Sequence, residues 1–178
     1  RLDANGQVLL AGEATALQIN ASWQDLQWPL VTAKGVAPDV LSPQGKIVVT
    51  GPVDDLQLLL EAQMPEGKIT GEAVYATDQL DAEIGWTQLS WPAQQPSVML
   101  KQGKVTASGV PGDLKLQAST LIEAAEAPAA RLQAQASLAE THLLLDDLKL
   151  ETLGGLIHAQ GKIDWAKQTA GHLVIKGS

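Results

Sequence analysis

The sequence contains no cysteine and no phenylalanine, and its aromatic residues, five Trp and one Tyr, make up 3% of the chain. Without thiols there can be no disulfide, no cysteine nucleophile and no thiolate ligand for a metal. Without phenylalanine, an apolar interior has to be built from leucine, valine, isoleucine and alanine. Such residues provide no bulky ring for the centre of a closed core.

Basic residues are scarce as well. The 178 residues include 12 Lys and Arg against 20 Asp and Glu, a net charge of -8, and no cluster of cations that would suit nucleic acid or an anionic membrane. No apolar run reaches the roughly 18 residues that span a bilayer, and no basic and then apolar leader opens the chain. We expect a soluble, ordered segment, and its start at Arg1 suggests a piece of a longer protein.

Residues that could perform catalysis or hold a metal lack suitable neighbours. His142, His158 and His172 have no acidic or histidine partner at ligand spacing, which favours ordinary surface or strand histidines over a metal site. The pairs Asp54-Asp55 and Asp146-Asp147 would form a paired-carboxylate site only if they converged in space. Solvated turn residues at strand starts are the favoured interpretation, and no catalytic residue, metal or cofactor is predicted.

Alternation of apolar and polar residues is the dominant pattern and indicates strands with one apolar face. The alternating apolar residues are Leu17, Ile19, Ala21, Trp23; Leu56, Leu58, Leu60; Ile69, Gly71, Ala73, Tyr75; Leu80, Ala82, Ile84, Trp86; Leu114, Leu116, Ala118; Leu132, Ala134, Ala136, Leu138; and Leu173, Ile175. The only candidate helix, 121–138, is rich in Ala and Glu, but Pro128 interrupts it and strict alternation follows. Strand, loop and strand are therefore predicted there.

An internal repeat is visible in the sequence. Trp23, Trp28 and Pro29 recur 63 residues later as Trp86, Trp91 and Pro92, and Gly45, Lys46, Gly51 and Leu56 recur 58 residues later as Gly103, Lys104, Gly109 and Leu114. We predict one elongated segment, 1–178, with repeat units at about 17–62 and 80–118 and partial units at 1–16 and 143–165. Repeated strand-turn units bury their faces by stacking on their neighbours.

Glycines six residues apart occur four times, at Gly6 and Gly12, Gly45 and Gly51, Gly103 and Gly109, and Gly155 and Gly161. The spacing and the residues that follow do not fit a phosphate-binding loop, so turns or bulges that bend a sheet are predicted. The tryptophans within each repeat are five apart, an offset that puts them on opposite faces of a strand unless a bulge intervenes. Packing at a repeat junction is favoured over exposed carbohydrate platforms.

The W-x-x-L-x-W-P strings WQDLQWP and WTQLSWP, the D-L-x-L runs after glycine-flanked strands, and the closing DDLKLETLGGLIHAQGKIDW resemble the C-terminal conserved region of the TamB family, within the AsmA-like, bridge-like lipid transfer group. The resemblance implies a curled, taco-like sheet with an apolar interior. It also implies a periplasmic protein anchored in the inner membrane that partners the outer-membrane barrel TamA. It brings no catalytic residues with it.

Alternation fits either a closed sandwich or an open trough whose apolar face meets something from outside. Repetition and the missing phenylalanine favour the open trough, an elongated half-pipe of all-β units. The residues predicted to line its groove are Val8, Leu10, Leu17, Ile19, Ile47, Val49, Leu56, Leu58, Leu60, Ile69, Leu80, Ala82, Ile84, Val105, Leu114, Leu116, Leu132, Leu138, Ile157, Leu173 and Ile175.

The predicted function is a segment of a periplasmic conduit that carries phospholipid acyl chains between the two membranes. A smooth aliphatic wall is sufficient for that purpose. One alternative is a scaffold that binds unfolded outer-membrane protein segments by strand addition. Another is a mechanical stalk or adhesin with no hydrophobic cargo.

Overall fold

A computed structural model describes residues 2–11, 14–28, 40–91, 97–165 and 170–177. They form one 12-stranded sheet. The strands are β1 (Leu2–Ala11), β2 (Ala14–Trp28), β3 (Val40–Pro52), β4 (Asp55–Gln63), β5 (Lys68–Ala76), β6 (Gln79–Trp91), β7 (Val98–Val110), β8 (Asp113–Ala124), β9 (Ala127–Ala139), β10 (His142–Thr152), β11 (Gly155–Asp164) and β12 (Ala170–Gly177).

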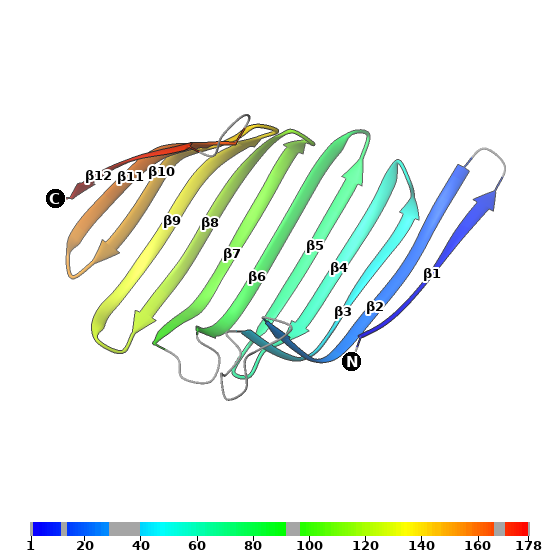
Figure 1. The fold of residues 1–178 in the computed structure, drawn as a ribbon, viewed down its shortest axis with the longest axis horizontal. Helices are drawn as coiled ribbons and strands as arrows, with labels where there is room; N and C mark the ends of the chain where they lie inside the picture. The colour runs from blue at the N-terminus through cyan, green and yellow to red at the C-terminus, as the bar shows by residue number, and fades with distance from the viewer. Residues whose placement is uncertain (1, 12–13, 29–39, 92–96, 166–169, 178) are drawn as a thin grey trace.

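The strands follow one another across the sheet in chain order, and every neighbouring pair is antiparallel. In Figure 1 the colours of the strands therefore follow the order of the bar from β1 at one end of a curved ribbon to β12 at the other, and the two ends lie far apart. The extensive contacts between strands are all between sheet neighbours. Within the described residues, no second layer covers either face.

Strand register gathers the alternating apolar residues on one face, which we call the inner face. Leu58 of β4 lies opposite Val49 of β3 and Ala73 of β5. The next residue, Leu59, points to the other side of the sheet and lies opposite Glu72. We call that second side the outer face.

The inner face is the concave side of the sheet. Along β4, residues 55–63 alternate strictly between exposed outer positions and less exposed inner ones, ending with the buried Ala62. In a single curled sheet, the face with the lower accessibility is the one toward which the sheet bends. The prediction of an all-β, elongated and curled sheet with an apolar concave interior is confirmed.

The molecule has almost no conventional core. Among the described apolar residues, only Ala62 and Ala159 are buried, with 8% and 6% of their surface exposed. The accessible surface is 11943 Å², whereas a compact monomer of 18.7 kDa exposes about 8300 Å². A curled single layer explains the excess, because no second layer of the described chain packs on either face of the sheet.

The region 121–138 contains no helix. β8 ends at Ala124, a turn occupies residues 125–126, and β9 begins at Ala127, as predicted. Pro128 is the second residue of β9, near the strand end where a missing N–H disturbs the ladder least.

The two repeat units have positive φ angles at corresponding positions. Asp25 and Gln88, 63 residues apart, both have positive φ angles, 53° and 50°. Neither residue has a partner in the strand register, so each marks a bend between the two tryptophans of its repeat. Gly51 and Gly109, 58 residues apart, also have positive φ angles, at the ends of β3 and β7. The bends at Asp25 and Gln88 are the interruptions that two tryptophans five residues apart would need in order to share one face of the sheet.

Candidate hydrophobic groove

Register places on the inner face every predicted groove residue whose side chain the structure describes. Four rows of cross-strand partners run across the sheet, and they pass through Leu56, Leu58, Leu60 and Ala62 of β4. The row through Leu60, for example, includes Ile47, Gly71, Ile84 and Val105. Leu10 has the same parity as Val8 in β1, but its side chain lies outside the described part of the chain.

The inner face carries no charge along these four rows. From β3 to β11 the described members of the rows are Leu, Ile, Val, Ala, Gly and Trp, with Tyr75 and Thr120 as the polar exceptions. The outer face holds the ion pairs, including Lys46–Glu61 at 3.1 Å and Lys104–Glu83 at 2.9 Å. Exposed apolar side chains such as Leu59 and Val74 occur on the outer face as well, but among the described residues the uninterrupted uncharged rows that could adapt to many shapes of apolar ligand lie on the concave side.

Trp23 is held on the inner face by packing over a glycine and by a hydrogen bond. Its indole ring lies directly over Gly45 of the neighbouring strand, where any Cβ would collide with the ring. Its Nε1 donates to Ser42 Oγ at 2.9 Å, and Ser42 Oγ donates to the carbonyl of Gln63 at 2.8 Å. Ser42 is buried, with 4% of its surface exposed, so this tryptophan is a packing residue and not an exposed platform.

Trp86 repeats the same packing without the hydrogen bond. Its ring lies against Gly103 as that of Trp23 lies against Gly45, but its buried Nε1 has no partner. The position that corresponds to Ser42, 58 residues later, is Leu100, whose side chain has no acceptor atom. The side chains of Trp28 and Trp91 lie outside the described part of the chain.

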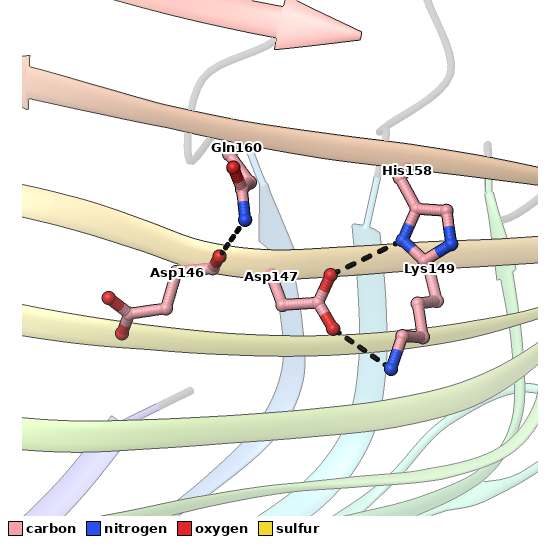
Figure 2. Close-up of polar contacts among 5 residues, drawn as sticks. All are labelled: Asp146, Asp147, Lys149, His158 and Gln160. Carbon is pink, nitrogen blue, oxygen red and sulfur yellow. Dashed lines mark hydrogen bonds and ion pairs between the residues drawn. The ribbon is translucent and has the colours of Figure 1, made fainter. Parts of the chain in front are cut away.

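A polar cluster lies on the outer face of β10 and β11 (Figure 2). Asp147 Oδ2 accepts from Lys149 Nζ at 3.0 Å, and Asp147 Oδ1 lies 3.4 Å from His158 Nδ1. The hydrogen bond from Lys149 lowers the pKa of Asp147 below its usual value, and His158 contributes in the same direction. The contact between Asp147 and His158 was not predicted from the spacing of the two residues in the sequence, because the pairing of β10 with β11 brings them together.

The position predicted for one acidic pair is wrong. Asp146 and Asp147 lie in the middle of β10, where the register shifts between Leu145 and Leu148, and not at a strand start. The extra residue of this bulge allows Leu145 and Leu148 both to lie on the inner face, while the two aspartates lie on the outer face. Figure 2 shows the two carboxylates pointing in different directions. Asp54 and Asp55 lie at the turn between β3 and β4, on strands that do not neighbour β10, so the two pairs form no shared site.

The described ranges lack two features that would point to another kind of site. No group of three or more His, Cys, Asp or Glu side chains is arranged to hold a metal ion there. No helix in the described part of the chain is long and apolar enough to cross a membrane. The uncharged inner face is therefore the candidate site that the described residues present.

Comparison with known proteins identifies the family. The family model described as "TamB, N-terminal domain" matches residues 66–175, more than half of the chain. No curated protein and no solved structure gives a significant match. The match corrects the region predicted from the tryptophan motifs, which was the C-terminal conserved region: residues 66–175 match the N-terminal domain model instead. The chain belongs to the TamB family.

Proposed function

We propose that this chain is a segment of a periplasmic conduit that carries phospholipid acyl chains along its inner face between the inner and outer membranes. One observation carries the proposal: the inner face is continuous, uncharged and uncovered by any second layer of the described chain. Membership of the TamB family supports a place in the translocation and assembly module, with TamA as the partner of the full-length protein.

The physical basis of carriage is apolar burial. Each methylene that leaves water contributes about 0.8 kcal/mol, so ten methylenes of an acyl chain contribute roughly 8 kcal/mol without any headgroup contact. The interaction has no preferred direction and changes little from one register to the next. An acyl chain can therefore move along rows of Leu, Ile, Val and Ala, and the direction of movement is set outside this segment.

A second candidate cargo is an unfolded outer-membrane protein segment. The observation that favours it is that the sheet of described residues has an edge at β1 and another at β12, each paired with one neighbouring strand. An extended polypeptide could add to such an edge through its main chain. The two candidates differ in the part of the molecule that they use, because lipid needs the inner face and a polypeptide strand needs an edge.

Site-specific photocrosslinking in the full-length protein tests the proposal. A photoreactive residue at Leu58 faces inward, and one at Leu59, with 54% of its surface exposed on the outer face, is the matched control. We expect phospholipid adducts from position 58 and none from position 59. Polypeptide adducts from position 58 would favour the second candidate, and equal lipid labelling at both positions would contradict the conduit.

A further inference from the structure

The two borders of the inner face, where the strands end and turn, differ in charge. Because the sheet is an antiparallel meander, the turns that follow β3, β5, β7 and β9 lie along one border together with the end of β11, at the upper edge of Figure 1. The described turns that follow β4, β8 and β10 lie along the opposite border. We compare the turns of each border together with the strand-end residues beside them.

The first border holds six acidic residues and no Lys or Arg among its described residues, and we call these six the acidic lip: Asp54, Asp55, Asp78, Asp113, Glu140 and Asp164. The opposite border, counted in the same way, holds Glu66, Glu126 and Lys68. The general preference of turns for Asp does not explain this difference, because turns on the opposite border contain Ala125-Glu126 and Leu153-Gly154 instead.

Most of the acidic lip is not neutralised by the described part of the chain. Asp164 has an ion pair, with Lys162 at 2.9 Å, and the other five carboxylates have none with a described residue. Turns on one border recur at every second strand, about 10 Å apart. The carboxylates therefore form a row along the groove and not a single cluster.

The acidic lip lies directly beside the apolar inner face. Tyr75 belongs to that face, where it lies between Leu56 and Leu80 near the end of its strand. Its hydroxyl donates to Asp78 Oδ1 at 3.0 Å, so an inner-face side chain touches a carboxylate of the lip. A phospholipid whose acyl chains lie on the inner face would place its headgroup at such a border, where water is available.

We propose that the acidic lip selects phospholipids whose headgroup ends in an ammonium group, and disfavours those that carry only the negative charge of the phosphate. The inference rests on the proposed function, since it assumes that acyl chains occupy the inner face. Charge complementarity is its basis: the row of carboxylates attracts a terminal ammonium and repels a lipid of net negative charge. At about 0.01 M ionic strength the Debye length is about 30 Å, so several carboxylates act on one headgroup at once.

A competition between two lipids tests the inference. The purified chain is incubated with vesicles of equal amounts of phosphatidylethanolamine and phosphatidylglycerol that have the same acyl chains, and native mass spectrometry counts each lipid bound. At low ionic strength we expect at least about five-fold more phosphatidylethanolamine than phosphatidylglycerol on the wild type. The ratio should approach one at about 1 M salt, where the Debye length is about 3 Å. This salt dependence requires no variant.

Two variants with equal changes in net charge locate the effect. The lip variant combines Asp54→Asn, Asp55→Asn, Asp113→Asn and Glu140→Gln, and its amides keep the turn-forming hydrogen bonds of the aspartates. The control variant removes two carboxylates from the opposite border and two from the outer face: Glu66→Gln, Glu126→Gln, Glu72→Gln and Asp81→Asn. With folding established by circular dichroism, we expect the lip variant to lose the preference and the control variant to keep it.

The outcomes separate this inference from the conduit itself. A wild type that binds both lipids equally, or a folded lip variant that keeps the wild-type ratio, would overturn the inference and leave the conduit standing. A loss of preference in the control variant as well would show that net charge is the cause, and would also overturn it. A folded wild type that binds neither lipid would overturn both proposals.

Discussion

At the scale of single residues, the chain shows how one strand position depends on its neighbour across the sheet. Gly45 is required because the ring of Trp23 occupies the space of a Cβ, and Ser42 is required because it accepts from that ring. The repeat keeps the first relation at Trp86 and Gly103 and drops the second, since Leu100 replaces the serine. The sequence predicts the tryptophan repeat, but it does not reveal which indole has an acceptor.

Ser42→Ala should therefore lower the free energy of unfolding by about 1–2 kcal/mol, because the buried indole N–H of Trp23 loses its acceptor. Urea denaturation followed by circular dichroism measures the change. Ser108→Ala, at an exposed outer position, is the matched control and should be close to neutral. Equal stability of the two variants would show that the hydrogen bond contributes nothing.

Asp147 gives a prediction for acid stability. Its pKa is lowered in the folded chain, chiefly by Lys149, so the folded state binds fewer protons than the unfolded state near the ordinary value of 3.8. The resulting stabilisation is present above that pH and is lost as the pH falls through the folded pKa. The melting temperature of the wild type should exceed that of Asp147→Asn at neutral pH, and the difference should shrink below pH 3.8. A difference independent of pH would exclude the charge as its cause.

At the scale of strands and turns, period-two alternation predicted the strands because it reports directly which face of each strand is apolar. The strands on either side of the turn at residues 125–126 were predicted for this reason, despite the helix propensity of the segment. The bulge at Asp146 and Asp147 was not predicted, because a single extra residue in β10 changes the register without disturbing the alternation on either side. Where such a shift in register occurs depends on the side chains of the two neighbouring strands, which lie far away in the sequence.

Glycine at the end of β7 is a requirement of the turn that follows it. Gly109 has a φ of 136°, and a Cβ there would collide with the carbonyl of Asp113. Gly109→Ala should therefore cost about 1–3 kcal/mol of unfolding free energy, as measured by thermal and urea denaturation. Gly85→Ala is the control within β6, where the nearest atom to a Cβ is 3.7 Å away. A control variant that loses as much stability would show that the strain at Gly109 is not the cause.

At the scale of the whole molecule, the question that alternation leaves open is whether a second layer covers the apolar face. Both a sandwich and a trough satisfy the same pattern, and only the sheet order decides between them. Here a meander of 12 strands in chain order produces one curled layer. Which residues share a face of the sheet could be predicted from their parity, whereas the shape that exposes them depends on long-range register.

An open inner face predicts that a charge there is compatible with folding. Leu58→Asp should leave the circular dichroism spectrum unchanged, because its carboxylate can reach water. It should reduce bound phospholipid at least about ten-fold, since hydrocarbon against an unpaired charge costs several kcal/mol. Leu59→Asp, on the outer face of the same strand, should retain the lipid. An unfolded Leu58→Asp protein would mean that the inner face acts as a closed core.

The central claim, that the inner face holds acyl chains, is tested most directly by native mass spectrometry of the purified chain. We predict a series of mass increments equal to whole phospholipids, and their loss in Leu58→Asp but not in Leu59→Asp. A wild-type chain that carries no phospholipid, even after incubation with phospholipid vesicles, would contradict the account.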